Sequence, residues 1–320
     1  MFMKREDIEK EIEECIKKAK NFSNQGEVAS YIPELKNVDE NGFALSIVTT
    51  GGDIYNFGEK EKIFSVQSIS KIFTLIMALK DNTTDEVFSK VGTEPTRYEF
   101  NSLIPIDQRA ANPFINAGAM TTTSMIYGKS EEEKFNRVME LIKQMSNDGT
   151  FTFMENIYKS EISTTDRNRA IAYYLKSKNI FAQNADEVLD LYVRICSIGT
   201  NVESLAKLGA LLANEGFDIH SSNLIIPQNI VQMTIAQMAS CGMYEKSGEY
   251  LMKVGIPSKS GVGGAILGVV PNKCGICVYS PRLDKSGNSV VGKNLLKILS
   301  ADLGLNICLL YTSDAADEAR

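Results

Sequence analysis

The sequence predicts an α/β fold in which an antiparallel sheet is flanked by helices and joined to a helical lobe. Two observations lead to this prediction. Candidate strands occur near both ends of the chain, and the segment between them is mostly helical in pattern. Strands from the two ends can pair in one sheet, and the helices between them then form a second lobe. With 320 residues and 43% hydrophobic content, the chain can bury a sizeable core.

The N-terminal third of the chain is expected to begin with a helix over residues 5–22, where apolar residues recur at helical spacing beside a charged face. Residues 42–59, GFALSIVTTGGDIYNFGE, predict two strands around the turn Gly51–Asp53, which is typical of a hairpin. A helix is expected directly after this hairpin, and it contains FSVQSISKIF and the apolar residues that follow.

From about residue 83 to 241 the pattern is mostly helical, with caps and breakers between the periodic segments. Helices are expected in EEEKFNRVMELIKQMSN, TTDRNRAIAYYLKSKN, ADEVLDLYVRICSI, VESLAKLGALLANEG and PQNIVQMTIAQMASCG. The stretches ANPFINAGAM and YKSEISTTD are expected to be polar loops. After residue 250, strands are expected in YLMKVGIPSKSG, GGAILGVVPN and KCGICVYSPRL, and a final helix in NSVVGKNLLKILSADLG.

The charge balance disfavours several classes of partner. A net charge of −6 and a pI near 5.2 provide no basic face, so neither nucleic acid nor an anionic membrane is expected. The first residues are charged and lack an apolar signal core, and no segment reaches the roughly eighteen apolar residues of a membrane span. We therefore expect a soluble cytoplasmic protein.

Metal and triad chemistry have little support in the composition. His220 is the single histidine, which excludes multi-histidine metal sites and makes any Ser-His-Asp triad depend on one loop residue. Cys274 and Cys277 form the one CxxC, in a strand-like segment where positions three apart face opposite sides. This arrangement favours buried structural cysteines over metal or redox chemistry.

The last residues, Cys308 to Arg320, do not continue the amphipathic pattern before them. CLLYTSDAADEAR resembles the translation of a transposon sequencing adapter, so residues 308–320 are expected to be a non-native tail.

Ser68 and Lys71 lie three residues apart in a stretch that is apolar on nearly every side. At that spacing they share a helix face, and burial favours the neutral amine, which can take a proton from serine. The alternative is that Ser68 only starts the helix and Lys71 extends to solvent. A second S-x-x-K, Ser204 to Lys207, has no supporting features, and we interpret it as an ordinary helix face.

The segment PSKSGVGGAI supports the first interpretation, because it places Lys259, Ser260 and Gly261 on a predicted strand. Such a strand beside a Ser-x-x-K helix is similar to the active site of serine β-lactamases and penicillin-binding proteins. The order of elements also matches this β-lactamase/transpeptidase-like fold. We expect Lys259 to lower the pKa of Lys71 further. The alternative is a polar edge strand with glycine kinks.

Longer segments identify one branch of this fold. FSVQSISKIF, NPFINAGAM, SEISTTDRNRAIAYYLK, SCGMYEKSGEY, GIPSKSGVGGAI and YSPRLDKSGNSVVG resemble the serine-dependent, β-lactamase-like glutaminases of bacterial and kidney type. The resemblance runs from about residue 28 to 305. It implies hydrolysis of L-glutamine to L-glutamate and ammonia by one domain, residues 1–307, with a sheet lobe at about 28–82 and 242–307 and a helical lobe at about 83–241.

The resemblance also implies catalytic roles. Ser68 corresponds to the nucleophile and Lys71 to its base, and the backbone N–H groups of Ser68 and Val262 would form the oxyanion hole. Tyr55 in GGDIYNFG resembles the tyrosine that approaches the nucleophile from the hairpin, and Tyr244 in CGMYEKSG the one that relays a proton to the leaving nitrogen.

Four further positions match the glutamine-binding residues of the family, namely Asn116, Glu161, Asn168 and Tyr192. Glu161 can pair with the α-ammonium group, while the amides and the phenol can hydrogen-bond the α-carboxylate. Each also has a structural interpretation: a turn residue for Asn116, a solvated loop acid for Glu161, a first-turn cap for Asn168 and a core residue for Tyr192.

Neither a metal nor an organic cofactor is expected, and the resemblance implies a homo-oligomer, either dimer or tetramer. Two rivals remain at this point: another serine hydrolase of the same fold, such as a β-lactamase or esterase, or a non-catalytic glutamine-binding module. An anionic β-lactam has no ammonium for Glu161 to pair with, which argues against the first rival. The second would not need Ser68, Lys71, Tyr244 and Lys259 together.

Overall fold

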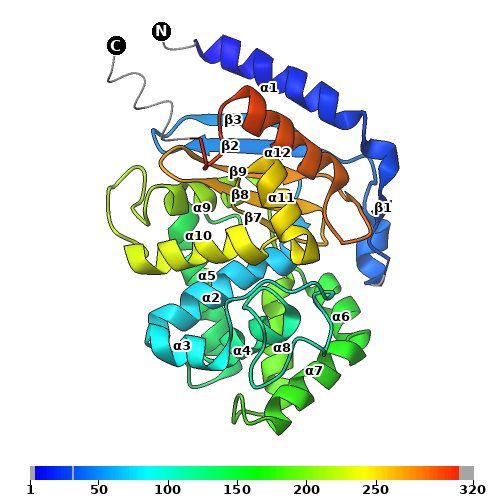
Figure 1. Ribbon diagram of the computed structural model, residues 1–320, viewed down its shortest axis with the longest axis vertical. Coiled ribbons are helices and arrows are strands. Elements are labelled where there is room, and N and C mark those ends of the chain that lie inside the picture. The colour runs from blue at the N-terminus through cyan, green and yellow to red at the C-terminus, as the bar shows by residue number, and fades with distance from the viewer. Residues whose placement is uncertain (1–3, 31, 310–320) are drawn as a thin grey trace.

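The computed structural model describes residues 4–30 and 32–309 (Figure 1). Its main sheet is antiparallel, with strand order β3-β2-β9-β8-β7. The strands are β2 (Ala44–Thr49), β3 (Ile54–Gly58), β7 (Ser258–Ser260), β8 (Ala265–Val270) and β9 (Cys274–Tyr279). β2 from the hairpin pairs with β9 from the C-terminal part of the chain, which confirms that strands from both ends share one sheet.

Helices cover the two faces of this sheet differently. Three helices that are adjacent in Figure 1 cover one face, namely α1 (Arg5–Lys20), α11 (Ser247–Val254) and α12 (Val290–Asp302). The other face packs on α9 (Val202–Ala213) and, beyond it, on the helical lobe. A two-stranded ribbon of β1 (Glu27–Val28) and β10 (Arg282–Leu283) lies at one side.

The helical lobe is built from eight helices among the described residues and one small sheet. The helices are α2 (Ser70–Asp81), α3 (Thr84–Lys90), α4 (Asn116–Ser124), α5 (Glu131–Ser146), α6 (Glu155–Ser163), α7 (Asp166–Ser177), α8 (Ala185–Cys196) and α10 (Gln228–Cys241). The sheet has the order β4 (Phe64–Ser65), β6 (Ile198–Thr200) and β5 (Thr152–Phe153).

The predicted amphipathic helices are confirmed, but three local predictions are wrong. α4 and α6 occupy stretches that the sequence suggested were loops. All nine residues of α4 are buried, so the helix has no polar face from which to recognise it. Tyr250 to Val254 belongs to helix α11 rather than to a strand, and Gly255 ends that helix in a left-handed conformation with φ 68°.

Two glycines allow α9 to lie against the sheet at backbone distance. A Cβ atom on Gly275 of β9 would be 2.2 Å from the carbonyl oxygen of Ala206 and from the amide nitrogen of Ala210. A Cβ on Gly209 of α9 would be 3.0 Å from the Cα of Gly275. The helix and the strand therefore touch without side chains between them.

Replacing Gly275 with alanine should lower the free energy of unfolding by about 3 kcal/mol, because the new methyl group forces α9 away from β9. Chemical denaturation followed by circular dichroism measures this change. Gly248→Ala is the matched control, since a Cβ there meets no atom within 4 Å. Equal stability of the two variants would contradict the close contact.

The structure also bears on the expectations for the CxxC cysteines, for membrane-spanning helices and for the C-terminal tail. Cys274 and Cys277 are buried free thiols in different core clusters on the two faces of the sheet, as alternation along a strand predicts. Among the described residues, no helix has the length and apolar character needed to cross a bilayer. The predicted tail, residues 308–320, lies outside the described residues from position 310 onward.

Candidate active site

Ser68 lies in a single 3-10 turn, Gln67–Ile69, that leads directly into α2. The amide of Val66 before it donates to the carbonyl oxygen of Ile198, at 2.8 Å, which ties this turn to the small sheet. On the other side, the chain after β7 passes the turn closely. A Cβ on Gly261 would be 2.6 Å from the carbonyl oxygen of Val66, so a glycine is needed for this approach.

Lys71 follows one helical turn later and is completely buried. Its Nζ donates to Asn116 Oδ1 at 2.6 Å and to the carbonyl oxygen of Phe114 at 3.3 Å. Burial lowers the pKa of Lys71 to about 8, and the nearby Cys196 and Glu161 oppose this shift. A substantial share of the molecules therefore carries a neutral amine near pH 8, as a general base requires.

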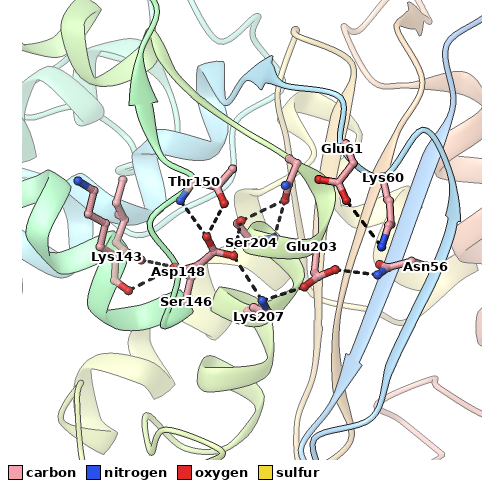
Figure 2. A network of polar contacts seen from close by, with 12 residues as sticks. Asn56, Lys60, Glu61, Lys143, Ser146, Asp148, Thr150, Glu203, Ser204 and Lys207 are labelled. Atoms are coloured by element: carbon pink, nitrogen blue, oxygen red, sulfur yellow. Dashed lines mark hydrogen bonds and ion pairs between the residues drawn. The ribbon is translucent and has the colours of Figure 1, made fainter.

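The second S-x-x-K lies in a different environment (Figure 2). Ser204 Oγ and Lys207 Nζ both donate to Asp148 Oδ2, at 3.0 and 3.3 Å, and Lys207 also pairs with Glu203 at 2.8 Å. Burial acts to lower the pKa of Lys207, but its hydrogen bonds and ion pairs outweigh burial and raise the pKa. The same spacing therefore holds a charged, paired lysine here, with no amine free to accept a proton.

Tyr244 approaches Ser68 from the 3-10 turn Tyr244–Lys246. Its hydroxyl donates to the carbonyl oxygen of Ser260 at 3.1 Å and is also hydrogen-bonded to the Ser68 side chain. Burial raises the pKa of this phenol. The ring of Phe100 packs against the Tyr244 ring, with 4.9 Å between centroids. Tyr244 thus has a fixed phenol in contact with Ser68.

Lys259, on β7, is also completely buried and shares an acceptor with Tyr244. Its Nζ donates to the carbonyl oxygen of Ser260 at 2.7 Å and lies 4.5 Å from the centroid of the Tyr244 ring. Burial, and then the charge of Lys71, hold the pKa of Lys259 well below its usual value. Two buried ammonium groups this close disfavour each other's charged form, and burial is the largest cause of the lowered pKa of both Lys71 and Lys259.

Asn116, at the start of α4, connects the candidate base to the helical lobe. Its Oδ1 accepts from both Lys71 and the Tyr192 hydroxyl, the latter at 3.2 Å. Its Nδ2 donates to Asn168 Oδ1 at 2.8 Å, and Asn168 in turn donates to Thr165 Oγ1 at 2.9 Å. These contacts fix the orientation of both amides.

Glu161 is a buried residue of α6, not a solvated loop acid. Gln67 Nε2 donates to its Oε2 at 3.2 Å. Burial raises the pKa of Glu161 to about 7, although the hydrogen bond from Gln67 and the charge of Lys71 act in the opposite direction. A carboxyl group with this pKa gains its full charge when a cation binds beside it.

These side chains surround a cavity of about 80 Å³. Ser68, Asn116, Glu161, Asn168 and Tyr192 all line it, so the structure brings five of the predicted residues together. The remaining lining residues are Ile32, Gln67, Phe100, Asn101, Thr164, Thr165, Arg167 and Cys196.

Val262 borders a neighbouring cavity of about 570 Å³, which shares Phe100 and Asn101 with the first. Among the described residues, no hydrogen bond occupies the amide of Val262. This amide is therefore available as a donor close to the turn that carries Ser68. His220, by contrast, is exposed in a distant loop and contributes nothing to this site.

The structure corrects the prediction for Tyr55. Its ring lies 4.9 Å from the guanidinium of Arg5 and packs in the core under α1 and α12. The preceding residue, Ile54, packs instead against the core on the face of the sheet where Ser68 lies. Because side chains alternate along a strand, Tyr55 points to the opposite face and cannot approach Ser68.

No sequence pattern indicates a role for Gln67 or Phe100, although both line the cavity. Gln67 lies within FSVQSISKIF, but a glutamine beside a serine has no distinctive pattern. Phe100 lies in an irregular segment without periodicity and reaches the site because its carbonyl oxygen accepts from the amide of Asn116, at 2.8 Å.

Known proteins resemble this chain over nearly its whole length. The Glutaminase family model matches residues 26–308. Glutaminase 2 of Clostridium perfringens is 42% identical over 300 residues, covering 92% of this chain and 98% of the relative. The glutaminase of Clostridium tetani is 43% identical over 304 residues, covering 94% and 99%.

Solved structures agree with this similarity. A probable glutaminase from Bacillus subtilis complexed with 6-diazo-5-oxo-L-norleucine superposes with a TM-score of 0.88 at 30% identity, covering 96% of this chain and 98% of that one. A Bacillus subtilis glutaminase in covalent complex with 5-oxo-L-norleucine, formed by reaction with the same diazo compound, gives a TM-score of 0.84 at 32% identity, covering 92% and 98%.

Proposed function

This chain belongs to the glutaminase family and hydrolyses L-glutamine to L-glutamate and ammonia, and we propose that the reaction proceeds through a γ-glutamyl ester on Ser68. The observation that carries this mechanism is the buried Lys71 amine one turn after Ser68, held by Asn116 at 2.6 Å. A coupled assay for glutamate on the purified protein tests the overall reaction, and trapping of an ester on Ser68 tests the intermediate.

Acylation begins when neutral Lys71 accepts the proton of the Ser68 hydroxyl. Ser68 Oγ then bonds to the γ-carbonyl carbon of glutamine, and the negative charge moves to the carbonyl oxygen. The amides of Ser68 and Val262 donate to this oxyanion. Fixed N–H dipoles stabilise the developing charge without reorganisation of the site.

The leaving nitrogen must gain a proton before the C–N bond breaks. Tyr244 contacts Ser68 and donates this proton, and the Lys71 ammonium returns one to the phenolate. Lys259 lies beside the Tyr244 ring. When the Lys259 amine is protonated, its positive charge stabilises the transient Tyr244 phenolate. Ammonia then departs. A water molecule attacks the carbonyl carbon of the γ-glutamyl ester, with the same groups transferring protons in the reverse order. The bond to Ser68 Oγ breaks, which releases glutamate and restores the Ser68 hydroxyl.

Substrate recognition uses the polar groups around the smaller cavity. We propose that Glu161 pairs with the α-ammonium group of glutamine, and that Asn116, Asn168 and Tyr192 hydrogen-bond its α-carboxylate. The linked hydrogen bonds of these three side chains hold them in place before the substrate arrives. Such pre-organisation reduces the entropic cost of binding.

Glu161→Gln should raise the KM for glutamine by about 100-fold with a smaller effect on kcat, because a buried ion pair with the ammonium is lost. In the wild-type enzyme, the carboxyl becomes neutral as the pH falls through its pKa of about 7. The KM for glutamine should therefore rise below pH 7, and this rise should vanish in the variant. Steady-state kinetics from pH 5.5 to 9 measure both effects.

Glutaramate, which carries the γ-amide and the carboxylate but no ammonium, provides the control for this prediction. Glu161→Gln should change its hydrolysis far less than that of glutamine. Equal losses on the two substrates would contradict the pairing of Glu161 with the ammonium.

We further propose that the enzyme works in the cytoplasm as a homo-oligomer, either dimer or tetramer. The five buried cysteines are free thiols, which suits a reducing compartment. The oligomeric state follows from the family, and light scattering on the purified protein tests it.

A further inference from the structure

Two buried residues in contact with the Ser68 turn have a left-handed backbone, namely Gln67 with φ 47° and Tyr244 with φ 56°. Five other described residues that are not glycine share a positive φ: Asn147, Asn179, Glu215, Ser222 and Asn272. All five are exposed, at helix ends or in turns. Left-handed backbone is unfavourable for any residue with a Cβ atom, and buried strain of this kind gathers at functional sites.

Contacts of its side chain and of the residue before it hold Gln67 in this conformation. Its side chain is 3% exposed and donates through Nε2 to Glu161 at 3.2 Å. The residue before it, Val66, is fixed by the hydrogen bond to Ile198. The residue after it is Ser68.

We propose that Gln67 is a positioning residue that aims the amide N–H of Ser68 at the oxyanion, with Glu161 as its anchor. The peptide unit between Gln67 and Ser68 carries this N–H, so the backbone dihedrals of Gln67 set its direction. This inference rests on the proposed mechanism, in which that amide binds the oxyanion. A donor aimed in advance contributes more to the transition state than one that must reorient.

The anchor links the two ends of the substrate. Glu161 faces the ammonium of glutamine. Through Gln67 it also holds the backbone amide of Ser68, which donates to the γ-carbonyl oxygen. A charged carboxylate accepts a stronger hydrogen bond than a neutral carboxyl. Below pH 7, pairing with the ammonium keeps Glu161 charged, so a bound α-ammonium strengthens the anchor there and raises kcat as well as affinity.

Three variants separate the anchor from the strain. Gln67→Met keeps the length of the side chain but removes the donor. Gln67→Ala and Gln67→Gly both remove the side chain, and only glycine adopts a positive φ without penalty. Asn147 has the same φ of 47° at an exposed helix end, so Asn147→Ala and Asn147→Gly form the matched control pair.

Gln67→Met should lower kcat at least tenfold, while the Kd of the product glutamate changes less than threefold. The hydrogen bond from Gln67 lowers the pKa of Glu161, so this pKa should be higher in the variant. The increase in KM at acidic pH should therefore begin at a higher pH than in the wild type. The glycine variant should be more stable than the alanine variant at both positions. At Asn147, however, kcat should not change.

A kcat for Gln67→Met within twofold of wild type would contradict the proposal that the hydrogen bond from Gln67 to Glu161 positions the Ser68 amide. If the alanine and glycine variants were equally stable at position 67 while the glycine variant was more stable at 147, the backbone of Gln67 would not be strained. If instead wild-type protein released no ammonia from glutamine, or Ser68→Ala released it at the wild-type rate, the proposed function itself would fail. The two failures are therefore distinguishable.

Discussion

Ser68→Ala should lower the turnover of glutamine by about 10⁴-fold or more, because no oxygen remains to form the γ-glutamyl ester. The substitution removes one buried oxygen and leaves the cavity and its polar lining in place. The Kd for glutamate should therefore change little, and the far-ultraviolet circular dichroism spectrum should be that of the wild type. Ammonia release from purified protein measures the turnover.

The second S-x-x-K offers a matched control for this experiment. Ser204→Ala removes a serine at the same spacing from a lysine, but one that is bonded to Asp148 instead of facing the cavity. Its kcat should stay near that of the wild type. Wild-type turnover in Ser68→Ala, or a comparable loss in Ser204→Ala, would exclude Ser68 as the nucleophile.

Lys71→Met should lower kcat/KM by about 10³-fold, because general base assistance to the serine is lost. In the wild-type enzyme, Lys71 is protonated below its pKa of about 8 and cannot then accept the serine proton. The kcat/KM should consequently rise between pH 7 and 8 as Lys71 loses its proton, and it should level off above pH 8. Below pH 7 the protonation of Glu161 makes the fall in kcat/KM steeper. The part of the profile that is due to Lys71 should disappear from the residual activity of the variant.

Stability distinguishes this lysine from its counterpart in the second motif. Lys71→Met replaces a fully buried amine by an apolar chain of similar length, so it should raise or preserve the free energy of unfolding. Lys207→Met breaks the pairs with Asp148 and Glu203 and should lower it, with kcat unchanged. A Lys71→Met enzyme with the wild-type pH profile would show that another group is the base.

The parts of this fold that are predictable from sequence are those that a local pattern marks. Helix α5 has one buried face, so its periodicity identifies it. Strands β2, β8 and β9 are buried on both faces and are recognised instead as short apolar runs between turn residues. α4 carries Asn116 but is buried on all sides, and no period marks it. Its helical state is imposed by the packing around it and not by its own composition.

The site was predictable to the extent that its chemistry follows from burial. The apolar residues around Lys71 indicate an amine shielded from water, and the structure buries it completely. The prediction for Tyr55 rests on a motif match alone, and such a match does not show which face of β3 a side chain occupies. Alternation along the strand places Tyr55 on the face opposite to Ser68. The left-handed turn at Gln67 arises from tertiary contacts alone, because a glutamine gives no local sign of a positive φ.

The contact between Gly209 and Gly275 bears on how the molecule can come apart. With α9 pressed directly onto β9, one continuous core joins residues of the sheet to those of the helical lobe. The cavity lies beside that shared core. Separating the helical lobe from the sheet would expose the apolar residues of this core to water, so we expect the two to melt together. Catalytic activity should then be lost on heating at the same temperature as the fold.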